Sequence, residues 1–181
     1  QSYVVILLDS IMSESVSISP VLMNRAIAGQ AEAQFEVAVL YMQSDFNEDI
    51  ELAEQWALKA AANGHIEAMY WLGEGYTVYA KDIQQDDPED AKQHFEDAFV
   101  WLKKASDAQH PAAILELAGY YRRGDVVEQD VARSVALVQQ AAELGEVQAM
   151  RDLAFIYANA LGVDADENKA EYWTQKADAA E

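Results

Sequence analysis

Small and apolar residues recur along this chain at helical spacing. In four segments an alanine is followed four, five and eight positions later by an apolar residue, a tiny residue and a tyrosine. The four sets are Ala33/Val37/Ala38/Tyr41, Ala68/Leu72/Gly73/Tyr76, Ala113/Leu117/Ala118/Tyr121 and Ala149/Leu153/Ala154/Tyr157. Because these positions share one face of an α-helix, each segment predicts a helix with one packing face.

A second helical pattern follows each of the first. It consists of a large residue, a cation or amide three positions later, and then alanine. Its sets are Trp56/Lys59/Ala60, Trp101/Lys104/Ala105, Leu137/Gln140/Ala141 and Trp173/Lys176/Ala177. Asp49, Asp130 and Asp166 stand seven residues before the large residue, where a carboxylate can cap a helix start. Helix ends are expected at Gly64 and Gly145, and in repeat 2 Gln109 occupies the same position in place of glycine.

The two patterns together form a repeat of helix A, loop, helix B and turn. Its first alanines lie 35, 45 and 36 residues apart, and such a period corresponds to one supersecondary unit. The sequence therefore predicts an all-α fold of helix hairpins. Ala38, Gly73, Ala118 and Ala154 would let helix A approach helix B closely, while the tyrosines and tryptophans fill the space beside them. The expected divisions are 1–28 (capping helices), 29–64 (repeat 1), 65–109 (repeat 2), 110–145 (repeat 3) and 146–181 (repeat 4).

This pattern resembles the Sel-1-like repeat, a relative of the tetratricopeptide repeat, over about residues 29–181. The fourth repeat carries the motif most fully, with Ala149, Leu153, Tyr157, Gly162, Val163, Asp166, Lys169, Ala170, Trp173, Lys176 and Ala177. The third carries Ala113, Leu117, Tyr121, Gly124, Val127, Asp130, Ala141, Ala142 and Gly145. The resemblance implies a right-handed α-solenoid of antiparallel helix hairpins, similar to the tetratricopeptide superhelix, whose helices A line a concave side.

Two stretches depart from the repeat. In the first 28 residues, Ser19-Pro20 is a good helix start, and 21–28 reads as a degenerate helix B that ends at Gly29. The run 3–12 would then be its partner helix and cap the stack, or it could bind another protein. Repeat 2 gains about ten residues within 77–90, whose acidic part reads as a long surface loop.

Charge narrows the choice of partner. The 181 residues include 32 Asp and Glu against 12 Lys and Arg, for a formal net charge of −20. Such a surface repels phosphate backbones and anionic lipid and attracts a basic protein, although the acidity could serve only solubility or a saline habitat. The longest apolar run is too short to span a bilayer. The chain starts at Gln1, so either a leader was removed or the sequence was trimmed, and bacterial cytoplasm and periplasm both stay open.

The sequence offers no catalytic, metal or cofactor signal. It has no cysteine, and His65, His94 and His110 read as surface residues of turns and helix starts. Two segments, 45–56 and 164–175, begin like calcium loops but lack the glycine and glutamate that such loops need. We therefore expect a protein that is not an enzyme and needs no cofactor.

The candidate partner-binding residues lie on helix A and in the insertion. Positions just before and three after the repeated alanine carry acids and one tryptophan, which suggests an acidic stripe with an aromatic anchor. The candidates are Glu32, Glu36, Glu67, Trp71, Glu74, Glu116, Tyr120, Asp152, Asp86 and Asp87. The alternative is an ordinary solvated helix face.

The expected function is a protein–protein interaction module that engages a basic surface through the acidic concave face. The resemblance makes a bacterial adaptor, or an inhibitor or immunity protein, the first interpretation. An exported adaptor in envelope assembly or host interaction is the alternative, and a hydrolase is the competing class.

Overall fold

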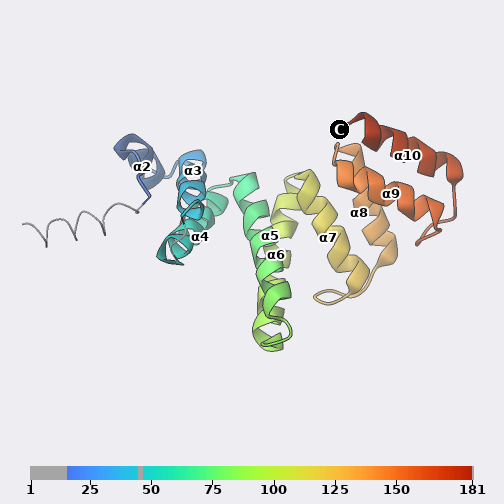
Figure 1. The fold of residues 1–181 in the computed structure, drawn as a ribbon, viewed down its shortest axis with the longest axis horizontal. Coiled ribbons are helices and arrows are strands. Elements are labelled where there is room, and N and C mark those ends of the chain that lie inside the picture. Colours follow the sequence, from blue (N-terminus) through green and yellow to red (C-terminus); the bar gives the residue numbers. More distant parts are fainter. Residues whose placement is uncertain (1–15, 45–46, 181) are drawn as a thin grey trace, which may run out of the picture. The chain divides into compact units, whose positions relative to one another are not determined.

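The structure, a computed structural model, describes residues 16–44 and 47–180 (Figure 1). Throughout these residues the regular secondary structure is α-helical, which confirms the all-α prediction. The helices are α2 (Pro20–Ile27), α3 (Ala31–Met42), α4 (Asn47–Ala62), α5 (Ile66–Ile83), α6 (Pro88–Asp107), α7 (Pro111–Arg123), α8 (Val131–Glu143), α9 (Val147–Ala158) and α10 (Glu167–Ala179). The chain forms two compact units, Gln1–Ala68 and Met69–Glu181, called unit 1 and unit 2 below.

In unit 1, α3 packs against both α2 and α4. The start of α2 matches its sequence prediction, because the Ser19 hydroxyl accepts a hydrogen bond from the backbone N–H of Leu22 at 3.2 Å. A small core of Leu22, Ala26, Ala33 and Val37 lies between α2 and α3, and Trp56 of α4 packs against it. The predicted helix over 3–12 lies outside the described residues.

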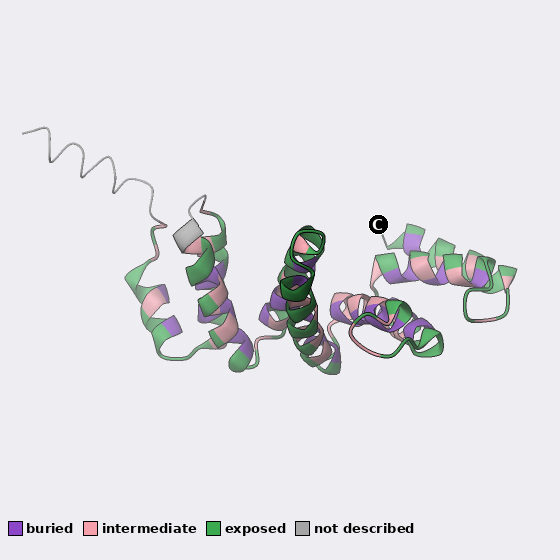
Figure 2. Ribbon diagram, turned by 90° about the horizontal axis from the view of Figure 1, so that it is seen from below, coloured by how far each residue is buried: buried purple, intermediate pink, exposed green. Residues whose placement is uncertain are grey.

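In unit 2, the helices pack as consecutive pairs, with α7 against α8, α8 against α9, and α9 against α10. Buried residues recur along these helices at the spacing that the sequence predicts (Figure 2). The main core joins Ile114 and Ala118 of α7, Val138 of α8, and Met150 and Leu153 of α9. Hydrophobic burial therefore runs continuously from one hairpin into the next.

The helix boundaries follow the predicted caps. The carboxylates of Asp130 and Asp166 accept hydrogen bonds from backbone N–H groups three residues later, at 2.8 and 3.0 Å. Asp49 instead lies inside the first turn of α4. Gly64 and Gly145 adopt left-handed backbone with φ of 88° and 97°, and Gln109 does the same with φ of 64° despite its side chain.

The acidic insertion of repeat 2 is mostly helical, so its prediction as a long loop is wrong. We expected a long loop, but α5 continues to Ile83 and α6 begins at Pro88, so only 84–87 connect them. The added residues lengthen both helices of this hairpin, to 18 and 20 residues against 13 each in α7 and α8. Ala80 and Ala91 are fully or nearly fully buried, and their packing explains why the segment is helical.

Candidate functional site

Two of the predicted acidic residues belong to α3 in unit 1. Glu32 is exposed, and its carboxylate lies 3.0 Å from Nε2 of His65. The Nδ1 atom of His65 accepts a hydrogen bond from the backbone N–H of Ala68 at 3.1 Å, so Nε2 carries the proton and donates to Glu32. Glu36 is also exposed on α3. Glu32 thus helps to orient a capping residue.

His65 and His110 are more than turn residues. Each is partly buried and caps a helix through Nδ1, since His110 accepts from the N–H of Ala113 at 3.2 Å. Each ring also lies against an aromatic ring from 30 or 40 residues earlier in the sequence. The ring centroids of His65 and Phe35 are 4.5 Å apart, and those of His110 and Tyr70 are also 4.5 Å apart. These histidines therefore hold helix starts against neighbouring helices.

In unit 2, carboxylates converge on Tyr70 of α5. Its hydroxyl donates to the carboxylate of Glu74 at 3.2 Å. Burial raises the pKa of Tyr70 well above its usual value, and the negative charges of Glu74, Glu116 and Glu146 raise it further. Carboxylates of α5 and α7, together with Glu146 at the start of α9, are thus close enough to act on one hydroxyl.

A groove in unit 2 brings two of the predicted acidic residues together. Glu116 of α7 and Asp152 of α9 both line it, and its volume is about 450 Å³. Gln148 donates to the Asp152 carboxylate at 2.7 Å and thereby fixes its position. The apolar part of the lining includes Leu115 and Phe155. We call this hollow the α7–α9 groove.

The α7–α9 groove also contains cations that the sequence analysis missed. Arg122 and Arg123 line it together with the two acids. Arg123 is anchored, because its Nε donates to Asp125 at 2.8 Å and its guanidinium lies 5.0 Å from the ring centre of Tyr120. The groove is therefore bipolar, with carboxylates and guanidinium groups on its walls.

Tyr120 is not a surface residue, and its prediction as a binding residue is wrong. Its side chain is 0% exposed, and its hydroxyl lies 2.7 Å from Oγ1 of Thr77. Phe95 and Phe99 of α6 pack edge-on against its ring. The reason lies in the helix period: position 120 is seven residues after Ala113, which is two turns of helix and returns to the same face.

The other candidate binding residues of α5 and of the α5–α6 hairpin lie outside the α7–α9 groove. Trp71 is half-buried on α5, whereas Glu67 and Glu74 are exposed on that helix. Asp86 and Asp87 lie at the tip of the α5–α6 hairpin. There Asp87 caps α6 by accepting a hydrogen bond from the N–H of Asp90 at 3.1 Å. These residues do not line the α7–α9 groove.

Within 16–44 and 47–180, no three His, Asp or Glu side chains are grouped so that they could hold a metal ion. Over the same residues no helix combines the length and the apolar character needed to cross a membrane.

Comparison with known protein families identifies the repeat. The model of the Sel1 repeat matches residues 31–65, 66–110, 111–146 and 147–177. This chain belongs to the Sel1 repeat family. Sel1 repeats are generally protein-interaction scaffolds, so the family supports protein partners and gives no sign of catalysis.

Among curated relatives, the chain is 28% identical to the Sel1-repeat-containing protein YjcO of Escherichia coli K12 over 161 residues. This alignment covers 87% of the chain and 65% of YjcO. Among solved structures, the chain resembles c5321, a protective antigen present in uropathogenic Escherichia coli strains that displays an SLR fold. The TM-score is 0.76 and the identity 30%, over 90% of this chain and 33% of c5321.

A Sel1 repeat protein from Oxalobacter formigenes shares the fold. Its TM-score is 0.74 and its identity 24%, over 88% of this chain and 62% of that protein. The chain thus spans between one third and two thirds of the length of these relatives. Its Sel1 solenoid fold is shown by the family match and by these structures together.

Proposed function

We propose that unit 2 of this Sel1 protein binds a basic segment of a partner protein in the α7–α9 groove. The observation that carries the proposal is the placement of Glu116 and Asp152 on the walls of one groove. Glu116 also acts on Tyr70 with Glu74, so the negative potential continues from the groove onto α5. A concave surface with several like charges attracts a partner of opposite charge more strongly than scattered charges do.

The groove also offers apolar contact, which charge alone would not provide. Leu115, Phe155 and Ile156 line it beside the two acids. Apolar area gives affinity, whereas the charged groups give orientation and speed of association. Trp71 on α5 is half-buried and remains a candidate aromatic contact near Glu74.

The arginines of the groove restrict the sequence of the partner. A segment with basic side chains facing Glu116 and Asp152 would place its next residues near Arg122 and Arg123. A carboxylate or backbone carbonyl there is favourable, and a second basic cluster is not. We therefore expect a short basic stretch followed by an acidic or polar residue.

The test compares the chain with a charge-reversed variant as bait for partner capture. The groove variant carries Glu116→Lys and Asp152→Lys in the groove, together with Glu74→Lys on α5, which acts on Tyr70 with Glu116. The matched control carries Glu96→Lys, Glu128→Lys and Glu143→Lys at exposed positions that do not line the groove. Each reversal adds two charges, so both variants change the formal net charge from −20 to −14. We expect the groove variant to lose the partner and the control variant to keep it.

Photo-cross-linking then locates the contact. Benzoylphenylalanine replaces Gln148, which lines the groove, or Gln139, an exposed residue of α8 outside it. The proposal expects a cross-linked partner at position 148 and none at 139. If the groove variant and the control variant lose the partner to the same extent, the groove is not the binding site. The same conclusion follows if only position 139 cross-links.

The captured partner also decides between the two forms of this function. An inhibitor or immunity protein would bind an enzyme and suppress its activity in a stoichiometric titration. An adaptor in the cell envelope or at the host surface would bind without changing the partner's activity. In both cases the contact is the same groove, so the charge-reversed variant serves both assays.

A further inference from the structure

Repeat 3 differs from the other repeats at two positions that line the α7–α9 groove. At these positions the other repeats carry only uncharged residues, most of them alanine. They are Ala53, Ala98 and Ala170 in helix B, three before the large residue, and Met42, Thr77 and Ala158 in helix A, nine after the first alanine. Repeat 3 carries Ser134 and Arg122 instead, and both line the groove. One hollow has therefore gained a hydroxyl and a cation that the repeat does not require.

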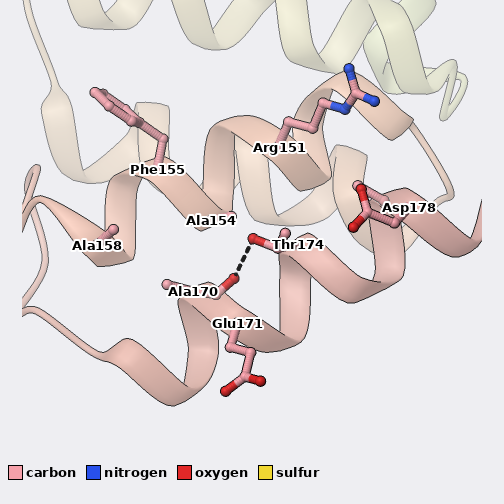
Figure 3. Close-up of a pocket in the computed structure, with 9 residues that line it drawn as sticks. Arg151, Ala154, Phe155, Ala158, Ala170, Glu171, Thr174 and Asp178 are labelled. Atoms are coloured by element: carbon pink, nitrogen blue, oxygen red, sulfur yellow. Dashed lines mark hydrogen bonds between the residues drawn. The ribbon is translucent and has the colours of Figure 1, made fainter.

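The hydroxyl of Ser134 is available to a bound molecule. Ser134 is only 5% exposed, and its backbone N–H donates within α8, but its hydroxyl has no hydrogen-bond partner in the part of the chain that the structure describes. By contrast, the hydroxyl of Thr174 donates to the Ala170 carbonyl of its own helix at 2.9 Å (Figure 3). Every fully buried side-chain nitrogen and oxygen of the described residues has a partner, so the Ser134 hydroxyl reaches solvent through the groove that it lines.

Arg122 places an uncompensated positive charge beside this hydroxyl. The end of α7 lies next to the start of α8, because the N–H of Asp130 donates to the Tyr121 carbonyl at 2.8 Å. Arg123 is paired with Asp125, whereas Arg122 is exposed and its guanidinium has no ion-pair partner within 16–44 and 47–180. A guanidinium and a hydroxyl can together hold the two oxygens of a carboxylate. A phosphate group carries nearly two negative charges, so a chain of net charge −20 repels it more strongly.

The loop between α9 and α10 bounds the groove at this end. Leu161 of the loop lines the groove. The next residue, Gly162, lies so close to the start of α8 that a Cβ atom built on it would be 2.6 Å from Cγ1 of Val131. A peptide that runs along the groove from the acidic residues therefore meets this loop and α8 at Arg122. An internal segment would have to turn out into solvent there, whereas a chain end would not.

From these contacts we infer that the α7–α9 groove binds the C-terminal end of its partner, with the terminal carboxylate at Arg122 and Ser134. The inference rests on the proposed function, because the basic side chain that faces Glu116 and Asp152 belongs to the same segment. Glu116 and Arg122 are six residues apart on α7, which is about 9 Å along the helix axis. An extended peptide rises about 3.3 Å per residue, so the basic residue lies about three residues before the C-terminus.

Short fluorescent peptides test the inference on the whole chain. Each carries lysine or arginine three residues before its last residue and varied apolar residues elsewhere, and each is made with a free C-terminal carboxylate and with a C-terminal amide. Fluorescence anisotropy measures the affinity of both forms. We expect the tightest peptides to bind at least tenfold more weakly as amides. Net charge alone would favour the amides, since they are more positive and the chain carries −20.

Two variants of the chain locate the carboxylate. Arg122→Gln should weaken binding of the free acids at least tenfold, and Ser134→Ala at least threefold, while both leave the amides unchanged. Ser134→Ala introduces the residue that the other repeats carry at this position, so the fold should be retained. Lys92→Gln is the matched control, because it removes an exposed cation of α6 that does not line the groove. It should change neither affinity.

The inference is overturned if acids and amides bind equally, or if Arg122→Gln weakens both forms to the same extent. It is also overturned if amidated peptides that end in aspartate or glutamate bind as tightly as the free acids, because the groove would then accept an internal acidic residue. In these cases, loss of peptide binding in the variant with Glu116→Lys and Asp152→Lys would still support the proposed function. If no peptide binds although the charge-reversed bait loses the captured partner, the inference fails and the proposed function stands.

Discussion

At the scale of single residues, the close packing of α5 against α6 depends on Gly73. A Cβ atom built on this residue would lie 2.6 Å from Cγ of Leu102, which is itself fully buried in α6. Real Cβ atoms are essentially never so close to a neighbour, so α5 and α6 would have to move apart. The tiny residue five positions after the repeated alanine is therefore required by packing.

Gly73→Ala should lower the free energy of unfolding by about 1–3 kcal/mol because of this overpacking. Gly75→Ala is the matched control, since Gly75 lies in the same helix and its added Cβ would meet nothing within 4 Å. That variant should raise stability by up to about 1 kcal/mol, because alanine is the better helix former. Urea denaturation of the two variants measures both effects. Equal changes in the two would show that the contact with Leu102 has no role.

Two tyrosines of unit 2 should make the free energy of unfolding fall at alkaline pH. Burial raises the pKa of Tyr120, and it also raises the pKa of Tyr70, where Glu74 adds to the effect. In the unfolded chain both ionise near pH 10. Since the folded pKa values are higher, their stabilising contribution is complete below pH 10 and is lost as pH rises above it.

The double variant Tyr70→Phe and Tyr120→Phe should therefore lose less stability between pH 9 and pH 11 than the original chain. Each tyrosine can contribute a slope of at most about 1.4 kcal/mol per pH unit. Guanidinium titrations at several pH values give this slope. Parallel slopes in the original chain and the double variant would contradict the explanation.

At the scale of helices and hairpins, the α5–α6 extension is an ordered structure with a defined cap. Asp87 accepts from the N–H of Asp90, and Pro88 occupies the first turn of α6. The exposed Asp86 beside it has no such role in the helix start. These neighbouring acids, which the sequence analysis treated alike, therefore differ in function.

Asp87→Ala should destabilise the chain by about 0.5–2 kcal/mol through loss of the cap. Asp86→Ala should change stability by less than about 0.5 kcal/mol. Thermal and urea unfolding of the two variants give the comparison. If instead both variants retained full stability and both lost the captured partner, the hairpin tip would be a binding element.

The sequence predicts the features that local residue spacing determines, and it fails for those that depend on the packing of distant residues. The helices A and B, the caps at Ser19, Asp130 and Asp166, and the left-handed Gln109 follow from local spacing, and the structure contains all of them. The insertion was misread, because acidity suggested a loop whereas buried Ala80 and Ala91 continue the helical period. Arg122 and Arg123 were missed as groove residues, because only the packing of α7 against its neighbours shows which side chains share a hollow.

At the scale of the whole molecule, the dominant property is a formal net charge of −20. Charges on an exposed surface act over about 8 Å at physiological ionic strength and are weakened further by added salt. A partner held by groove carboxylates must therefore bind less tightly at high salt. A partner held only by apolar contact would show little such dependence.

The most direct test of the central claim is the affinity of the captured partner at 50 and 300 mM NaCl, measured by calorimetry. It compares the original chain, the variant with lysine for Glu74, Glu116 and Asp152, and the control with lysine for Glu96, Glu128 and Glu143. We predict that salt weakens binding to the original chain and to the control. The groove variant should bind at least tenfold less tightly at low salt and lose most of the salt dependence. Equal affinities and equal salt dependence in the two variants would contradict the claim that the α7–α9 groove binds the partner.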